Sequence, residues 1–244
     1  MRPLSASELI EVWERGVGQS SVERAITLLS ACAGEPVEGL WALSIGQRDA
    51  RLATIYERLF GETLDAFAEC PQCAERLEYS MSARVLDLTA TADRNVEDLA
   101  LVCGEISLRL CLPNSLDLSA AAACDTVAAA RTLLARRCIV QAEEGGNAVP
   151  VPTLPDSLVD RIATRLKEAD PQAETLINLT CAVCRHQWQV VLDIERFLWV
   201  RLAALAKRLL REVHILARAY GWREADILAL SAVRRQFYLE MAGA

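Results

Sequence analysis

The stretch CPQCAERLEYS, residues 70–80, places two cysteines with a two-residue spacer ahead of a segment with strand-like alternation. A second stretch, CAVCRHQWQVVLDI at residues 181–194, repeats this spacing, and a β-branched, strand-like segment again follows it. A two-residue spacer lets one tight turn, here called a knuckle, direct both sulfurs toward one ion. Two knuckles supply the four thiolates of a closed tetrahedral site. We therefore predict a structural Zn²⁺ site formed by Cys70, Cys73, Cys181 and Cys184.

Four cysteine ligands favour a structural metal over a hydrolytic one, because catalytic zinc keeps a coordination position open for water or substrate. Common zinc ribbons place their knuckles about 15 to 20 residues apart, whereas 107 residues separate Cys73 from Cys181. We expect a split ribbon, which is physically permitted because loop closure costs only logarithmically in length. The alternative is two unrelated cysteine pairs. A thioredoxin-like redox role is disfavoured, since neither pair opens a helix after a strand within a βαβ pattern.

The two histidines are not assigned as ligands. His186 lies two residues after Cys184, where four thiolates already fill the coordination shell. We expect it to pack over the knuckle or to hydrogen-bond a sulfur. His214 lies within a helical pattern and is interpreted as a partly buried helix residue, because a lone histidine makes no catalytic site.

The composition describes a globular chain of one or two domains, with 244 residues, 52% hydrophobic and 24% charged. The first 16 residues contain three glutamates and lack the uninterrupted apolar stretch of a secretory signal. No window approaches about 18 uncharged apolar residues, which argues against a membrane span. We expect a cytoplasmic protein, in which the nine cysteines are metal ligands or buried thiols. Cys32, Cys124 and Cys138 lie in apolar helical surroundings and are interpreted as small core residues.

Hydrophobic periodicity predicts an α+β fold that is mostly α-helical and contains a small split four-cysteine zinc-ribbon β module. The patterns SASE (5–8) and SSVE (20–23) are capping boxes that predict two early helices, and a third helix ends near Phe60. Asp193 is expected to cap a long amphipathic helix that Gly221 ends, with two shorter helices after it. We expect five segments: an N-terminal helical region (1–66), the first knuckle with its ribbon strands (67–90), a mainly helical insert (91–177), the second knuckle with its strand (178–193) and a C-terminal helical tail (194–244).

The insert contains one clear strand pattern. In GEISLRLCLP (104–113), leucines and an isoleucine alternate with other residues, which predicts a strand with one buried face that could pair with the ribbon. The alanine-rich stretch 116–142 predicts helix, and EEGGNAVPVPTLP (143–155) is the clearest loop of the chain. A further helix is expected to run through Glu168.

The distribution of charge leaves a functional ambiguity. The whole chain carries −7, but residues 185–244 hold ten Lys or Arg against six Asp or Glu. A basic helical tail beside a zinc ribbon is compatible with a nucleic-acid-binding or transcription-associated adaptor. The basic residues are spread around the helices, however, and an overall acidic chain argues against strong phosphate binding. An acidic body with a basic tail is as readily explained by docking onto other proteins, where charge steers association.

The sequence contains no recognisable catalytic motif. It has no phosphate-cradling glycine loop, no nucleophile elbow, no HExxH and no histidine-centred triad. We therefore do not expect an enzyme, and no catalytic residue is assigned.

Five stretches together resemble one family: LSIGQRDARL, FGETLDAFAECPQCAERLEY, LRLCLPNSLDL, EADPQAETLINLTCAVCRHQWQVVLDIERFLW and LLREVHILARAYGWREADILALSAVRRQFYLEM. The family comprises the baseplate-hub assembly proteins of contractile phage tails and of phage-tail-like injection particles. The resemblance spans nearly the whole chain. Its most specific parts are the two widely separated knuckles and the Tyr-Gly-Trp at 220–222, followed by an acidic Ile-Leu-x-Leu segment.

The resemblance implies a non-enzymatic cytoplasmic protein that acts while the baseplate or its central hub is built, with baseplate, hub or spike proteins as partners. A chaperone that is absent from the finished particle is one form of that role. One residue departs from the pattern, since Arg185 stands after the second knuckle where a glycine is expected. We expect this residue to alter the turn without removing a ligand.

Overall fold

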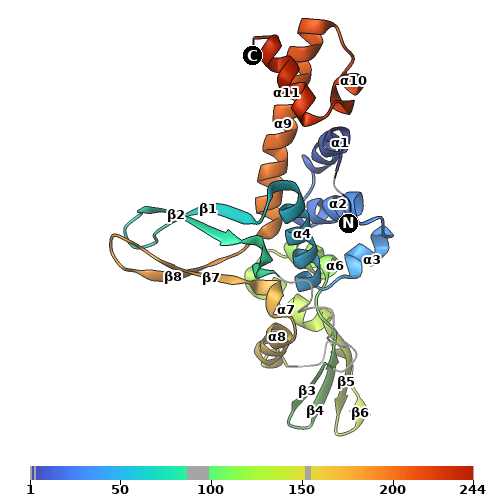
Figure 1. The fold of residues 1–244 in the computed structure, drawn as a ribbon. Helices are drawn as coiled ribbons and strands as arrows, with labels where there is room; N and C mark the ends of the chain where they lie inside the picture. The colour runs from blue at the N-terminus through green and yellow to red at the C-terminus, as the bar shows by residue number, and fades with distance from the viewer. Residues whose placement is uncertain (1, 3, 87–98, 152–154, 244) are drawn as a thin grey trace.

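The structure is a computed structural model that describes residues 2, 4–86, 99–151 and 155–243. Its class is α+β and mostly α-helical, which confirms the sequence prediction (Figure 1). The helices are α1 (Ala6–Gly16), α2 (Ser21–Ala33), α3 (Val37–Ala42), α4 (Ile45–Phe60), α6 (Ser115–Ala122), α7 (Val127–Arg137), α8 (Leu158–Ala169), α9 (Ile194–Tyr220), α10 (Glu224–Ala229) and α11 (Ala232–Met241), with short 3₁₀ helices η1 (Ala83–Val85) and η4 (Pro171–Glu174). The strands are β1 (Thr63–Glu69), β2 (Arg76–Ser82), β3 (Ala100–Cys103), β4 (Ile106–Leu110), β5 (Ile139–Glu144), β6 (Asn147–Ala148), β7 (Leu176–Thr180) and β8 (Gln187–Val191).

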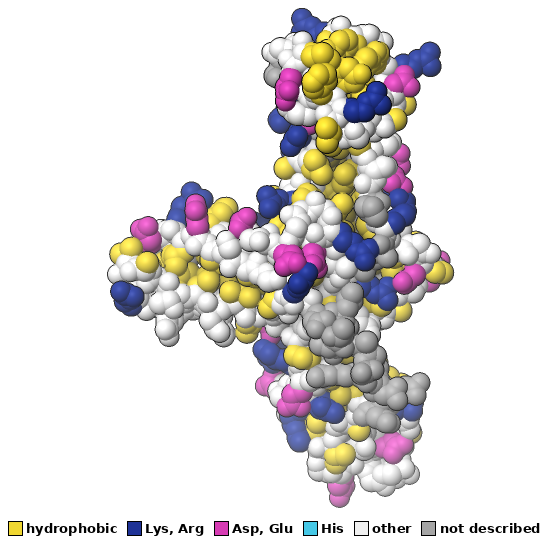
Figure 2. All heavy atoms as spheres, in the orientation of Figure 1, with side chains coloured by type: hydrophobic (Ala, Val, Ile, Leu, Met, Phe, Trp, Pro, Cys, Tyr) yellow, Lys and Arg dark blue, Asp and Glu magenta, His cyan; other side chains and the backbone are white. Residues whose placement is uncertain are grey.

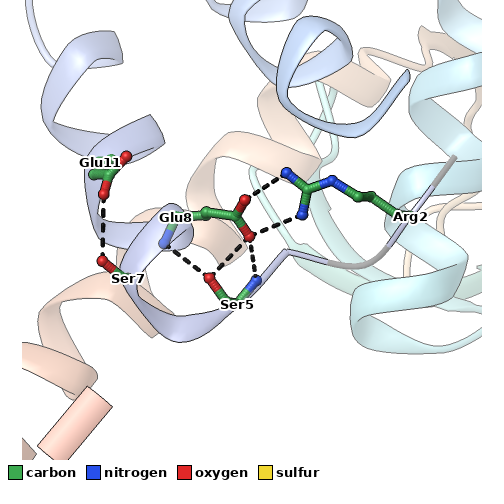
Figure 3. Close-up of polar contacts among 5 residues, drawn as sticks. All are labelled: Arg2, Ser5, Ser7, Glu8 and Glu11. Atoms are coloured by element: carbon green, nitrogen blue, oxygen red, sulfur yellow. Dashed lines mark hydrogen bonds and ion pairs between the residues drawn. The ribbon is translucent and has the colours of Figure 1, made fainter. Parts of the chain in front are cut away.

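The first helices begin where the capping patterns predict. At α1, the backbone N–H of Glu8 donates to Ser5 Oγ, and the Glu8 carboxylate accepts from the backbone N–H of Ser5 at 2.9 Å (Figure 3). The guanidinium of Arg2 also donates to this carboxylate and, together with the bonds from Ser5, lowers the pKa of Glu8 to about 2. The same reciprocal arrangement starts α2 at Ser20 and Glu23. These caps satisfy backbone donors that a helix start otherwise leaves unpaired.

The helical body forms around one apolar core. Helices α1, α2, α4 and the first half of α9 bury leucines such as Leu28, Leu52 and Leu198 completely. Helix α1 approaches α9 closely at Gly16, where an added Cβ would lie 2.3 Å from the ring of Trp199. The body therefore fixes the start of α9, which follows directly from the second knuckle and its strand.

The two knuckles lie at the turns of two antiparallel hairpins. Strands β1 and β2 pair from Thr63↔Ser82 to Glu69↔Arg76, and β7 and β8 pair from Leu176↔Val191 to Thr180↔Gln187. The hairpins lie side by side and project from the body, with their turns at the far end (Figure 1). We call residues 63–82 and 176–191 the arm. One face of each hairpin is only half-buried (Ala66, Ala68, Leu77, Tyr79, Trp188 and Val190), so the arm holds little core of its own.

The segment between the hairpins contains more β-structure than the single strand that the sequence predicts there. Its described residues include helices α6, α7 and α8 together with a four-stranded sheet of order β3-β4-β5-β6. The strand predicted at 104–113 exists as β4, but its partners are β3 and β5, so the suggested pairing with the ribbon is wrong. Strand β5 takes in residues 139–142, which were expected to be helical, and residues 143–144, which were expected to begin the loop. The expected ribbon–insert boundary at residue 90 lies outside the described residues.

The insert is fastened to the body at the start of α4. Asp170, 4% exposed, accepts a hydrogen bond from the backbone N–H of Gly46 at 2.9 Å across 124 residues of sequence. A second contact is the bond from the N–H of Ile45 to the carbonyl of Pro113. Because η4 follows Asp170 and leads into β7, this attachment returns the chain to the root of the arm.

Helix α9 carries a small C-terminal module. As predicted, the Asp193 side chain caps α9 and Gly221 ends it in a left-handed conformation. Helices α10 and α11 pack against the end of α9 through a core that includes Leu216, Ile227 and Leu239. The outer face of α11 is apolar and exposed (Val233, Phe237 and Met241), and Figure 2 shows apolar atoms gathered at this end of the molecule. His214, expected to be partly buried, is exposed on α9.

Among the described residues, no helix has both the length and the apolar character that crossing a membrane requires.

Candidate metal centre

Each knuckle is a tight turn closed by two backbone hydrogen bonds. In the first knuckle, the N–H of Ala74 donates to the carbonyl of Cys70 at 2.9 Å, and the N–H of Cys70 donates to the carbonyl of Glu75 at 2.8 Å. The second knuckle repeats both bonds at equivalent positions. The N–H of Arg185 donates to the carbonyl of Cys181 at 3.0 Å, and the N–H of Cys181 donates to the carbonyl of His186 at 2.9 Å. The two turns are thus copies of one backbone geometry.

The residue after each knuckle adopts a left-handed backbone conformation, with φ of +59° at Ala74 and +62° at Arg185. These are the non-glycine residues with positive φ in the described part of the chain. Glycine adopts this conformation without steric cost, which explains why a glycine is expected there. Arg185 keeps the same geometry as its counterpart Ala74, so the departure from the pattern leaves the turn intact.

The arm brings the four predicted cysteine ligands together. Their four sulfurs all lie within 4.8 Å of one another, and both knuckles contribute to the closest pairs. Cys70 Sγ lies 3.6 Å from Cys184 Sγ, and Cys73 Sγ lies 3.6 Å from Cys181 Sγ. A tetrahedral site with Zn–S bonds of about 2.3 Å separates its sulfurs by about 3.8 Å. The sulfur positions therefore fit a Zn²⁺ ion, and the donor set is made of thiols alone.

The electrostatics of the cluster favour a bound cation. The backbone N–H of Cys184 lowers the pKa of Cys181 to about 7 despite burial. The N–H of Glu75 also lowers the pKa of Cys73, but desolvation and the neighbouring thiols outweigh it and raise that pKa to about 12. Adjacent thiolates repel one another, so the group does not lose all its protons without a compensating charge. A divalent cation provides that charge.

The site is enclosed on one side. Cys70 and Cys181, the first cysteine of each knuckle, are buried, whereas Cys184 is half-buried and Cys73 is exposed. His186 stays outside the thiol group. Its ring stacks near Trp188 with 6.0 Å between centroids. Its backbone N–H lies against Cys184 and lowers the pKa of that thiol, but desolvation and the thiols of Cys70 and Cys181 raise this pKa overall.

The other five cysteines do not join this group. Cys32 and Cys138 are buried core residues as expected, but Cys124 is only half-buried. Cys103 is the last residue of β3 and is buried in the core of the insert. Cys111 lies beside Cys138, whose thiol donates to it and lowers the pKa of Cys111 to about 7. All nine cysteines are free thiols in the structure.

Sequence reasoning identified the four thiols but missed the backbone donors around them. The N–H groups of Glu75, Val183, Cys184 and His186 all lie against a sulfur. The sequence did hold a signal for these donors, because both knuckles have the same spacing and therefore form the same turn. The same turn directs equivalent backbone N–H groups toward the sulfurs.

A comparison with protein families gives a match over residues 9–199 to the model described as T4 bacteriophage base plate protein. The chain belongs to this base plate protein family. The matched region of the chain includes most of the helical body, both hairpins and all four clustered cysteines. Helices α10 and α11 lie beyond it. No curated protein and no solved structure gives a significant match.

Family membership gives this chain a structural or assembly role in a phage baseplate and indicates contacts with other baseplate proteins. The family match confirms the resemblance to phage baseplate proteins that the sequence showed.

Proposed function

We propose that this chain is a non-enzymatic assembly factor or structural component for the baseplate or hub of a contractile phage tail or tail-like injection particle. Its four clustered thiols, Cys70, Cys73, Cys181 and Cys184, bind one structural Zn²⁺. The observation that carries the proposal is that the family match includes two knuckles whose sulfurs meet across a long insert. The client is a baseplate, hub or spike protein, and assembly takes place in the cytoplasm.

The metal makes the arm rigid. A bound Zn²⁺ with four thiolates has no open coordination position, so it supplies cross-linking and no hydrolytic chemistry. The hairpins have half-buried inner faces and therefore little apolar burial to hold them together. A metal cross-link between the two turns holds the hairpins together at the end of the arm that lies farthest from the core of the body.

A rigid arm suits a protein that positions other proteins. The arm exposes Phe67 on β1 and Val183 in the second knuckle, which are 67% and 66% exposed. Exposed apolar side chains on a projecting element are typical of protein contacts. Arg76 stacks over the ring of Phe67 at 4.7 Å and holds this side chain in place.

Affinity capture from cells that express the complete tail operon tests the role. A tagged chain is expected to retain baseplate, hub or spike proteins, and a Cys73→Ser, Cys184→Ser double variant is expected to lose them. A Cys124→Ser chain is the matched control and is expected to retain the same partners. Recovery of no tail protein by the parent chain would count against the assembly role.

The alternative of a zinc-ribbon nucleic-acid-binding or transcription-associated adaptor makes a different prediction. Binding to DNA or RNA through the basic tail would weaken steeply as salt concentration rises. Two of the tail arginines, Arg208 and Arg235, are ion-paired with Glu212 at 2.8 and 2.9 Å, which reduces the charge available for phosphates. We therefore expect no steep salt dependence in a gel-shift titration.

A further inference from the structure

Two cysteines outside the metal centre face each other in the insert, at the point where α7 ends and β5 begins. Strands β4 and β5 pair up to Leu110↔Ile139, and Cys111 and Cys138 are the next two residues in this register. The backbone N–H of Cys111 donates to the carbonyl of Cys138 at 2.8 Å, so the pairing extends to them. Their side chains also share a hydrogen bond, in which the Cys138 thiol is the donor.

This placement meets the distance requirement of a disulfide. Residues opposite each other in a hydrogen-bonded antiparallel pair have Cα atoms about 5.5 Å apart. A disulfide requires about 4.4 to 6.8 Å between the Cα atoms, with the two side chains directed toward each other. The hydrogen bond between the thiols of Cys111 and Cys138 shows that their side chains have this direction. Rotation of the side chains is therefore enough to bring the sulfurs into bonding distance.

The two thiols differ in exposure and in acidity. Cys111 is half-buried, whereas Cys138 is 0% exposed. The bond from Cys138 lowers the pKa of Cys111 to about 7, while the same bond and burial raise the pKa of Cys138. The charged groups near the pair, Asp117 of α6 and Arg137 of α7, are ion-paired with each other at 2.7 Å. Because the thiolate is the nucleophilic form of cysteine, Cys111 is the reactive member of the pair.

We propose that Cys111 and Cys138 form a redox-active pair, in which Cys111 reacts with a peroxide and Cys138 converts the product into a disulfide. An accessible, acidic thiol beside a second thiol that resolves it is the arrangement typical of redox-sensing cysteines. The proposal concerns thiols that the metal does not use, and it is independent of the baseplate role.

The chemistry takes two steps. In the first, the Cys111 thiolate attacks one oxygen of hydrogen peroxide, the O–O bond breaks, an S–O bond forms, and the other oxygen leaves as hydroxide and takes up a proton. In the second, the Cys138 thiol releases its proton and its sulfur attacks the sulfur of Cys111. The S–O bond breaks, the S–S bond forms, and the departing hydroxide takes up the proton. The two sulfurs together lose two electrons, and the peroxide gains them and becomes two water molecules.

The disulfide would act next to the attachment of the insert to the body. It closes a loop of 26 intervening residues that contains α6 and α7. Pro113, two residues after Cys111, is the residue whose carbonyl accepts the N–H of Ile45 at the start of α4. Oxidation therefore stiffens the insert beside this contact. Thiol systems of a reducing compartment cleave such a bond, so the stiffening is reversible.

The test treats the full zinc-loaded chain with an equimolar amount of hydrogen peroxide and maps its peptides by mass spectrometry without reduction. The expected product is a pair of peptides joined through Cys111 and Cys138, with two hydrogens lost, which dithiothreitol separates. The zinc content is expected to stay at its starting level. Cys124→Ser is the matched control, because Cys124 is also half-buried and its thiol lies against the carbonyl of Ala120 at 4.0 Å. This variant is expected to form the same disulfide.

Two variants separate the roles of the thiols. Cys138→Ser is expected to leave Cys111 as a sulfenic acid that dimedone traps, and Cys111→Ser is expected to leave the buried Cys138 unoxidised. A measurement on the parent chain needs no substitution at the buried position. At pH 7, iodoacetamide is expected to label Cys111 about threefold faster than Cys124, since the larger thiolate fraction outweighs the lower nucleophilicity that accompanies a lower pKa.

Three results would overturn the proposal. The first is the absence of a Cys111–Cys138 disulfide, or a disulfide that joins Cys111 to another cysteine. The second is oxidation of the four clustered cysteines, with loss of zinc, before Cys111 reacts. The third is equal labelling of Cys111 and Cys124 by iodoacetamide. None of these results bears on the baseplate role, since the Cys111→Ser chain is expected to capture the same tail proteins as the parent.

Discussion

The residues that follow the two knuckles show how a single backbone torsion shapes the metal centre. Ala74 and Arg185 hold positive φ angles that cost side-chain-bearing residues about 1 to 2 kcal/mol. Each turn accepts this strain because it directs amide donors toward the sulfurs of its own knuckle. The backbone strain at Ala74 and Arg185 is therefore linked to the geometry of the cysteine ligands. Its free-energy cost can be measured by replacing either residue with glycine.

We predict that Arg185→Gly and Ala74→Gly each stabilise the zinc-loaded protein by up to about 1 kcal/mol, since the relief of strain exceeds the added entropy of the unfolded chain. Thermal unfolding measures the change. Val183→Gly, within the second knuckle but without positive φ, is the control and is expected to give no gain. A lower melting temperature for both glycine variants would contradict this view of the turn.

Replacement of a single thiol tests the ligand assignment. Cys70→Ser is expected to lower the zinc content well below one ion per chain, because a serine hydroxyl is a poor substitute for a thiolate ligand. Cys124→Ser is the control, since Cys124 is half-buried and lies outside the thiol group, and it is expected to keep its metal. Elemental analysis after dialysis gives the stoichiometry. Unchanged zinc in the Cys70 variant would remove this residue from the site.

At the scale of elements, the arm depends on how the insert is attached to the body. The Asp170 carboxylate accepts the N–H of Gly46, and it occupies the space that a Cβ would need, with Oδ1 at 1.9 Å from that position. The attachment therefore requires a glycine at the start of α4. It also fixes where β7 begins relative to the body.

We predict that Gly46→Ala destabilises the protein by about 1 to 3 kcal/mol, because the Asp170 carboxylate must move and the buried N–H loses its acceptor. Urea denaturation followed by circular dichroism measures the change in unfolding free energy. Gly39→Ala in α3 is the matched control, since nothing lies within 4 Å of its added Cβ, and it is expected to be neutral or slightly stabilising. Equal stability of the two variants would show that the attachment contributes nothing.

Local signals in the sequence were sufficient for some elements and not for others. The starts of α1, α2, α9 and α11 follow from capping residues, because a cap and its partner lie within three residues. Strand β5 was missed, because it continues an alanine-rich stretch and gains its structure from pairing with β4. Alternation in β4 indicated a buried face but gave no information on which strand lies beside it. Helix α3 has only six residues and strand β1 carries a weak alternation, and both were missed.

The candidate site was predictable for a related reason. Four cysteines in two equal knuckles specify a chemistry that needs no knowledge of the intervening fold. The burial of Glu195 was not predictable, since it depends on how distant parts of the chain pack around the start of α9. A single acidic residue at the start of a helix gives no sign that it will be buried.

On the scale of the whole molecule, the body and the arm differ in what holds them together. The body has a continuous apolar core, whereas the arm consists of two two-stranded sheets joined at the thiol group. Two-stranded sheets are marginally stable in water. Loss of metal should therefore affect one part of the molecule far more than the other.

We predict that a strong chelator makes the backbone amides of β1, β2, β7 and β8 exchange with deuterium much faster, while α4 and the first half of α9 keep their protection. Hydrogen exchange with mass spectrometry locates the change by peptide, and a lower melting temperature is expected to accompany it. Unaltered exchange in the arm of protein shown to be metal-free would contradict the role of the ion as a cross-link.

The long separation of the two knuckles has a consequence for biosynthesis. When β1 and β2 leave the ribosome, the second knuckle has not yet been translated, so Cys70 and Cys73 lack the other two thiols of the group. An ion captured early would have only half of its ligands and would exchange readily with other cellular thiols. The centre closes only after about three quarters of the chain has been made, and a nascent chain that stops short of Cys184 cannot retain the metal.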